Sequence, residues 1–375
     1  MKVKKILAAI LAATMVMGLV ACGTSEESTA PTEASSEDLA VATTEAAPAG
    51  NGTHIYVLTP SEDHGWTGSV ATFAKEKAEE INAAGTYSAE VITATDANDQ
   101  IAKIEDIVAK GESNIAVVIL PMDDTVENAI RQIVDAGIPY VAFDRIIDSV
   151  SSSAVANVKG DNEGIGAGAA AYFVGLGMMP GDRVYVYEGD TSSVTGLRDS
   201  GFYEYLTGKI AFEGQTIADD KKWTEDQLTN ITTSGAMNWS RSATKDHFES
   251  LMGDAANADI KWIYAEDDEL ALGIFEALNG GGIDDATKAK FLGNSPVITG
   301  CGGLNEYYEV IRGNLYQDLA SQCAGVMSVT YNPSMIQTAI QDMVDYLDGK
   351  DVVQDHVIEC KNVTSDNVAD FAAFN

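Results

Sequence analysis

Short apolar runs alternate along this chain with amphipathic helical patterns, and this alternation constrains the fold more than any other feature. Runs such as His54–Thr59, Ile115–Leu120 and Ile138–Phe143 are continuously apolar, which is typical of parallel strands covered on both faces. Segments between them, such as Thr67–Ile81, place apolar residues on one helical face. The pattern restarts after about residue 160, although the stretch from 207 to 238 is less regular. We therefore expect two α/β lobes with parallel sheets and helices on both faces.

The first 52 residues differ in composition from the rest. Lys2, Lys4 and Lys5 precede a short apolar stretch, and the run Leu-Val-Ala-Cys that ends at Cys22 resembles a bacterial lipobox. That resemblance implies a signal peptide over 1–21 and a lipid on the Cys22 sulfur; an ordinary secretory leader with a chance cysteine is the alternative. Residues 22–52 are rich in Ser, Thr, Ala, Glu and Pro, which predicts a flexible, lipid-anchored stalk. We expect a protein held at the cell membrane on its extracytoplasmic face.

The net charge limits the binding partners that this chain can have, and its cysteines leave one possible disulfide open. The formal net charge is −34 and the pI is about 4.2, which argues against nucleic acid or anionic lipid head groups as partners. Three cysteines follow Cys22, and they could include a Cys301–Cys323 disulfide or could all be small buried residues, with Cys360 the third. The spacing of His and Cys predicts no metal site.

Polar and aromatic side chains follow the predicted strands, at the edge where parallel sheets bind ligands. Carboxylates and guanidinium groups bind two neighbouring groups at once, which suits the vicinal hydroxyls of a sugar, and tryptophans can cover its apolar C–H faces. With two lobes, the natural place for such a site is the cleft between them. The candidates from this placement are His64, Trp66, Asp96, Asp144, Arg145, Arg198, Trp239 and Asp267.

From Thr53 to its end the chain resembles the type I periplasmic sugar-binding proteins of the ribose, galactose and xylose group, which serve ABC importers. The resemblance implies two Rossmann-like lobes, 53–160 plus 332–360 and 161–331 plus 361–375. The resemblance also implies sugar contacts for the eight residues above and for Tyr331. The chain departs from the family's Gly-x-Asp-Gly pattern at Gly302, where the family has Asp, and this suggests an altered pocket. The segments that carry it are TPSEDHGW, QIAKIEDIVAKG, VVILPMDD, AGIPYVAFDR, VKGDNEGIG, GLRDSGF, NWSR, AEDDELALG and VTYNPSMI.

Each candidate also has a purely structural interpretation. Asp267 could cap the helix that begins near Glu269, and Tyr331 could pack at a hinge before Pro333. Trp66 and Trp239 could be ordinary core aromatics. In the same way His64 could lie in a turn, Arg198 could face a helix end, and Asp144 with Arg145 could form a plain ion pair.

Enzymatic alternatives fit less well. Gly164 to Ala169 match the G-x-G-x-x-A pattern of dinucleotide-binding folds, but Lys159–Glu163 separate them from the preceding strand, where a tight turn is required. We interpret these glycines as a helix face that packs closely. The paired acids Asp267 and Asp268 could suggest a glycosidase, but neighbours in sequence are a poor fit, since the two carboxylates of such an enzyme must flank one glycosidic bond. We therefore predict a non-enzymatic, monomeric binding protein without cofactors that delivers a small-molecule sugar to an ABC permease; the alternatives are a sugar-sensing subunit for a histidine kinase and a dinucleotide-dependent enzyme.

Overall fold

The computed structural model describes residues 52–61 and 65–375, all within one compact unit, Ala46–Asn375. Cys22, the signal peptide and the predicted stalk up to residue 51 lie outside the described residues, and so does His64. Within the described ranges no helix is long and apolar enough to cross a membrane.

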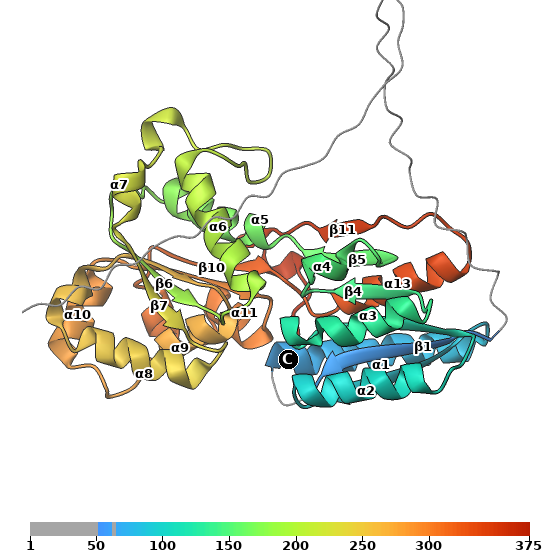
Figure 1. The fold of residues 1–375 in the computed structure, drawn as a ribbon. Coiled ribbons are helices and arrows are strands. Elements are labelled where there is room, and N and C mark those ends of the chain that lie inside the picture. Colours follow the sequence, from blue (N-terminus) through green and yellow to red (C-terminus); the bar gives the residue numbers. More distant parts are fainter. Residues whose placement is uncertain (1–51, 62–64) are drawn as a thin grey trace, which may run out of the picture. The chain divides into compact units, whose positions relative to one another are not determined.

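Two sheets organise this unit (Figure 1). All strand pairs are parallel except β12 with β10, and an antiparallel edge strand on a parallel sheet is common. The prediction of two α/β lobes built on parallel sheets is confirmed, with β12 as the one departure among the described strands. The first sheet runs β11 (Asp355–Ile358), β5 (Ala156–Gly160), β4 (Tyr140–Phe143), β3 (Ile115–Ile119), β1 (His54–Pro60), β2 (Ser88–Ala94). The second runs β12 (Asn362–Val363), β10 (Gly325–Thr330), β9 (Val297–Gly302), β8 (Trp262–Ala265), β6 (Val184–Glu188), β7 (Ile231–Ala236).

Helices cover both faces of the first sheet. Successive residues of β1 show why: Ile55 packs in a core cluster with Val70 of α1, whereas Tyr56 packs in another with Ile104 of α2. Side chains that alternate across a strand therefore supply two apolar faces, and each face buries a helix pair. The helices of this lobe are α1 (Gly65–Ala84), α2 (Ala97–Ala109), η1 (Asp124–Val126), α3 (Glu127–Asp135), α4 (Asp148–Ser151) and α13 (Met335–Leu347).

The second sheet is covered in the same way. Tyr264 of β8 stacks on Phe202 of α6, while its neighbour Ile263 packs in the cluster that contains Phe248 of α8. The helices of this lobe are α5 (Asn162–Gly175), α6 (Ser193–Thr207), η2 (Asp219–Lys221), α7 (Glu225–Leu228), α8 (Arg241–Met252), η3 (Ala255–Asp259), α9 (Asp268–Asn279), α10 (Asp285–Gly293), α11 (Asn305–Ile311), α12 (Gln317–Ala320) and η4 (Val368–Asp370).

The chain passes between the sheets where one strand ends and the next element belongs to the other lobe. β5 of the first sheet is followed by α5, which packs on α6. β10 of the second sheet is followed by α13, which packs on α1. Finally β11 pairs in the first sheet and β12 in the second.

Two features differ from the sequence-based expectation. β7 lies in the stretch that we expected to be irregular, because it is an edge strand whose Thr232 and Thr233 are exposed and which forms no apolar run. Cys301, Cys323 and Cys360 are free thiols, so the disulfide interpretation is wrong, and Cys301 and Cys360 are buried in the core.

Candidate ligand-binding site

A cavity of about 240 Å³ lies where strands of both sheets end. Its lining comes from the segments that directly follow β1, β3, β4, β8, β9 and β10, and from the helix and loop that follow β6 and β7. The lining residues are Pro60, Ser61, Trp66, Thr67, Leu120, Met122, Asp144, Arg145, Val194, Arg198, Trp239, Asp267, Asp268, Glu269, Leu304, Tyr331 and Phe374.

The structure brings most of the residues suggested by the sequence to this one cavity. Trp66, Asp144, Arg145, Arg198, Trp239, Asp267 and Tyr331 all line it. Asp96 does not: it is exposed, and its carboxylate accepts a hydrogen bond from the Asp99 backbone N–H at 2.9 Å as the N-cap of α2. A helix cap accounts for Asp96 without any ligand.

Asp144 is placed by an unusual backbone conformation. It follows β4 with φ 64°, a left-handed value that Asp tolerates better than most residues, and its N–H donates to Val158 O at 2.8 Å. The Tyr331 hydroxyl donates a hydrogen bond to its carboxylate. Burial raises the pKa of Asp144, and the neighbouring Arg145 and this hydrogen bond oppose the shift. Asp144 and Tyr331 therefore form one polar unit that joins the end of β4 to the end of β10.

Arg198 is only 3% exposed and is fixed from several sides. Its Nε donates to Asn162 Oδ1 at 3.0 Å, and its Nη1 donates to the Glu266 carbonyl. The guanidinium carbon lies 5.3 Å from the ring centre of Trp239 and 4.8 Å from that of Tyr331, within cation–π range. A planar cation clamped in this way presents a rigid fork of donors to the cavity.

Two tryptophans flank the polar groups. Trp66 stacks on Phe143 and Tyr331, with ring centres 6.2 Å and 5.4 Å apart, and its indole N–H donates to Tyr331 O at 2.8 Å. Trp239 lies so close to Gly189 that a Cβ there would sit 1.9 Å from the indole ring. Both rings thus have packing partners and also border the cavity, so the two interpretations of these residues are compatible.

The acidic run after β8 supplies three lining residues. Asp267 caps α9 by accepting from the Glu269 N–H at 2.7 Å. Burial raises its pKa to about 8, and the adjacent Asp268 carboxylate acts in the same direction. Asp268 accepts hydrogen bonds from Ser328 Oγ and from the N–H groups of Gly303 and Leu304, at 2.7–2.9 Å. A raised pKa favours the protonated form of the Asp267 carboxyl group, and that form can donate a hydrogen bond as well as accept one.

Gly302, where the family resemblance led us to expect Asp, has φ 138°. L residues rarely adopt this conformation, and a Cβ there would lie 3.4 Å from Asp268 Oδ2. The carboxylate of Asp268 therefore occupies the space beside this turn. The lining that the sequence did not reveal includes Leu304 and Phe374, because a buried Leu or Phe gives no signal that separates a lining residue from the core.

The space beside the glycines Gly166 and Gly168 of the G-x-G-x-x-A run is occupied by protein atoms. A Cβ at Gly166 would lie 1.9 Å from Arg198 O, and one at Gly168 would lie 2.6 Å from Asn362 Oδ1. This face of α5 is packed against α6 and the β12 strand, as the close-packing interpretation requires. Among residues 52–61 and 65–375, no group of three or more His, Cys, Asp or Glu side chains could hold a metal ion.

Comparison with known proteins places the chain in a family. Residues 55–351 match the model of the periplasmic binding protein domain, and the chain belongs to this family. It is 26% identical over 274 residues to the fructose import binding protein FruE of Bifidobacterium longum, covering 71% of this chain and 72% of that protein. It is 27% identical over 191 residues to the ribose import binding protein RbsB of Bacillus subtilis, covering 50% of this chain and 54% of that protein.

Solved structures agree on the fold. A galactofuranose-binding protein superposes with a TM-score of 0.64 at 19% identity, covering 85% of this chain and 96% of that one. The predicted membership in the type I periplasmic binding proteins of ABC importers is confirmed by these matches together.

Proposed function

We propose that this protein captures a monosaccharide outside the cytoplasm and delivers it to an ABC permease. The observation that carries the proposal is the cavity itself, which combines the clamped Arg198 fork, the Asp144 and Asp267 carboxyl groups and two tryptophans. This set offers both donors and acceptors to vicinal hydroxyls and apolar faces to a sugar ring. Its volume of about 240 Å³ suits a single sugar ring better than an oligosaccharide. The fructose and ribose import proteins among the relatives support the same class of ligand.

We infer the mechanism of ligand capture from the contacts that residues of the two lobes make with each other around the cavity. Besides the Tyr331–Asp144 hydrogen bond, Arg145 after β4 lies 3.7 Å from the carboxylate of Asp190 after β6. A ligand that bridges such groups binds the closed arrangement better than an open one, and so shifts the population toward closure. The closed lobe pair is then the form that a permease recognises. Turnover is not part of this mechanism, so the protein acts as a carrier and not as an enzyme.

The N-terminal sequence supports a membrane-tethered carrier. Cys22 in its lipobox-like context would carry the lipid, and the polar stretch that follows would give the binding unit reach above the membrane. A lipid anchor would keep the carrier near its permease at the membrane, even in a cell where no closed periplasm retains it.

A sugar screen tests the proposal. The purified protein is scanned by thermal shift against aldoses, ketoses and their furanose-rich members, and calorimetry follows for each compound that raises the melting temperature. Arg198→Ala and Asp144→Ala should each weaken binding of the best sugar by more than about tenfold, because each leaves a buried polar partner unpaired.

Asp96→Ala is the matched control. It removes another carboxylate that the sequence suggested, but one that caps a helix away from the cavity. Its affinity should equal that of the wild type. The proposal fails if no sugar binds, or if Arg198→Ala and Asp144→Ala both bind with unchanged affinity.

A further inference from the structure

Glu269 connects the ligand cavity to the contact between the lobes. We propose that Glu269, held rigid by Arg241, is a latch: its carboxylate reaches from the second lobe to the N-terminus of α1 in the first lobe and stabilises the closed arrangement. This inference rests on the proposed function, since it names the residue that sets how tightly the carrier closes on its ligand.

Glu269 lies between two hollows. It lines the ligand cavity and also a second cavity of about 580 Å³, with Leu304 shared between the two. Gly65, Arg241 and Glu306 line only the second cavity. The Glu269 side chain therefore stands at the boundary of the ligand site and not deep inside it.

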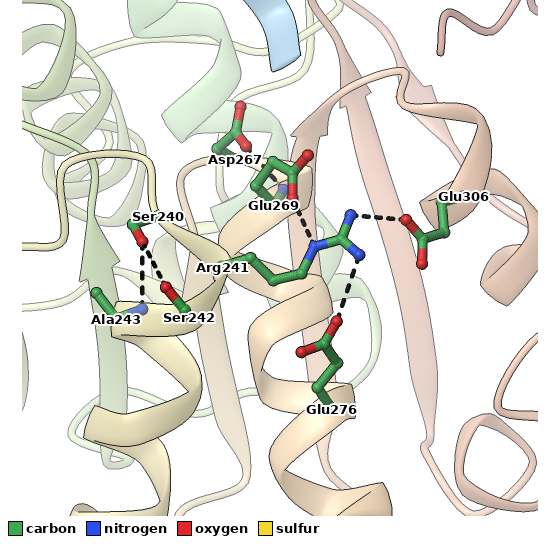
Figure 2. A network of polar contacts seen from close by, with 8 residues as sticks. All are labelled: Ser240, Arg241, Ser242, Ala243, Asp267, Glu269, Glu276 and Glu306. Atoms are coloured by element: carbon green, nitrogen blue, oxygen red, sulfur yellow. Dashed lines mark hydrogen bonds and ion pairs between the residues drawn. The ribbon is translucent and has the colours of Figure 1, made fainter. Parts of the chain in front are cut away.

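Arg241 fixes the position of the Glu269 carboxylate (Figure 2). Its Nε lies 2.6 Å from Glu269 Oε2, its Nη2 lies 2.7 Å from Glu306 Oε2, and its Nη1 lies 3.4 Å from Glu276 Oε1. The guanidinium is thus shared among three carboxylates that are each partly buried. A charge-assisted pair at 2.6 Å holds one oxygen of Glu269 on Arg241 and leaves the other directed elsewhere.

The helix packing beneath this network brings Arg241 within reach. α8 carries Arg241 and α9 carries Glu269 and Glu276, and the two helices meet at Gly273. A Cβ at Gly273 would lie 2.5 Å from Arg241 O. The absence of a side chain at Gly273 therefore allows the two helices to approach closely.

The second oxygen of Glu269 meets the first lobe. Glu269 Oε1 lies 3.2 Å from the position that a Cβ of Gly65 would occupy. Gly65 is the first residue of α1, a helix of 20 residues whose own first turn has no acidic side chain. The N–H groups of a first helical turn have no partners within the helix, and a carboxylate there is stabilised by the helix dipole. The Glu269 carboxylate of the other lobe lies beside this first turn.

A neighbouring contact joins the same two regions. Ser69 Oγ, one turn along α1, donates to Asn375 O at 2.8 Å. The adjacent Phe374 pairs with Leu304 of the second lobe. The first turns of α1 therefore rest on the second lobe at two points, and both contacts are lost when the lobes separate. A ligand that binds only the closed protein is bound more tightly when these contacts make the closed arrangement more stable.

Three single variants of the full protein test the latch. Glu269→Gln keeps the shape of the side chain and removes its charge. Gly65→Ala pushes a methyl group against Glu269 Oε1 without touching the ligand cavity, which Gly65 does not line. Glu276→Gln is the matched control, because Glu276 lies on the same helix and contacts the same arginine but lines neither cavity.

The measurements are the Kd of the best sugar by calorimetry, the radius of gyration of the ligand-free protein by small-angle X-ray scattering, and the ligand-free melting temperature. Glu269→Gln should bind the sugar about 3- to 10-fold more weakly and should have a larger ligand-free radius, because the helix N-terminus loses its carboxylate. Gly65→Ala should also bind more weakly and have a larger ligand-free radius, yet melt no lower than the wild type, because Ala favours helix more than Gly does. Glu276→Gln should match the wild type in affinity and radius.

Unchanged affinity in Glu269→Gln and Gly65→Ala would overturn the latch. Weaker binding in Glu269→Gln but not in Gly65→Ala would also overturn it, since Glu269 would then act by touching the ligand. If no sugar binds the wild type, the proposed function fails, but the latch is still decided by scattering from the ligand-free proteins. A radius of gyration that is the same in Glu269→Gln and the wild type would refute it.

Discussion

Replacement of Gly166 by Ala should damage this protein far more than the same change elsewhere on the same helix. Gly166 of α5 faces α6, where a new Cβ would lie 1.9 Å from Arg198 O and 2.5 Å from Phe202 N. The contact is reciprocal, because a Cβ at Gly201 of α6 would lie 1.9 Å from Glu163 O. All of these partners are backbone atoms, so the strain cannot be relieved by turning a side chain, and the two helices must separate.

The size of the effect follows from two opposed contributions. An Ala in place of Gly in a helix gains about 0.5–1 kcal/mol where there is room. Forced overpacking of a well-packed region costs about 1–3 kcal/mol or more. Gly175 is the matched control, because it lies on the same helix and no atom lies within 4 Å of its added Cβ. The gain from Ala applies to both variants, so they should differ in free energy of unfolding by the cost of overpacking, about 1–3 kcal/mol or more, with Gly166→Ala the less stable.

Urea denaturation of both variants measures this difference, and thermal melts should show Gly166→Ala roughly 3–10 °C below the wild type. Because Arg198 O is itself the displaced atom, Gly166→Ala should also bind the sugar more weakly than Gly175→Ala. Equal stability of the two variants would refute the close-packing argument. Binding of NAD that is abolished by Gly166→Val would instead favour the dinucleotide-dependent enzyme.

Three further predictions concern the anchor, the hinge and the buried acids. Cys22→Ser should release the protein into the medium or leave it unprocessed, and continued incorporation of radiolabelled lipid would contradict the lipobox interpretation. Tyr331→Phe removes only the hydroxyl that donates to Asp144, so calorimetry should show about tenfold weaker sugar binding with both aromatic stacks intact. Burial raises the pKa of Glu266 to about 8, with Arg198 opposing the shift. A raised folded-state pKa contributes stability that is complete below the ordinary Glu value of about 4.3 and is lost as pH rises through about 8. The ligand-free melting temperature should therefore fall between pH 5 and 8, and the same slope in Glu266→Gln would show that another group is responsible.

Much of the fold could be predicted because parallel strands buried on both faces leave a strong mark. The runs near Ile115 and Tyr140 are apolar at every position, and their strands lie in the middle of the first sheet. β7 gave no such mark, because an edge strand with exposed Thr residues has no need for continuous apolar side chains. The antiparallel strand β12 has two residues, which is too short for any periodicity.

The candidate site was predictable to the extent that it follows strand ends. Asp144, Trp239 and Tyr331 stand directly after strands or in the loops that follow them, and parallel sheets gather such positions at one edge. Asp96 occupies an equivalent position but lies outside the cavity lining, because its side chain is used to cap α2. A place directly after a strand brings a residue to the edge of the sheet where the cavity lies. The hydrogen bonds that its side chain makes then decide whether that side chain faces the cavity.

The sequence by itself determined the α/β class, the restart of the pattern after residue 160 and the strand-end placement of the polar groups, because these follow from local periodicity. The tertiary structure alone decided that Glu269 of one lobe meets Gly65 of the other, and that Tyr331 donates to Asp144 across 187 residues of chain. It also decided that Phe374, next to the last residue, lines the same cavity as Pro60. Such contacts join residues far apart in the chain, and their geometry depends on how two lobes pack, which no local pattern of residues records.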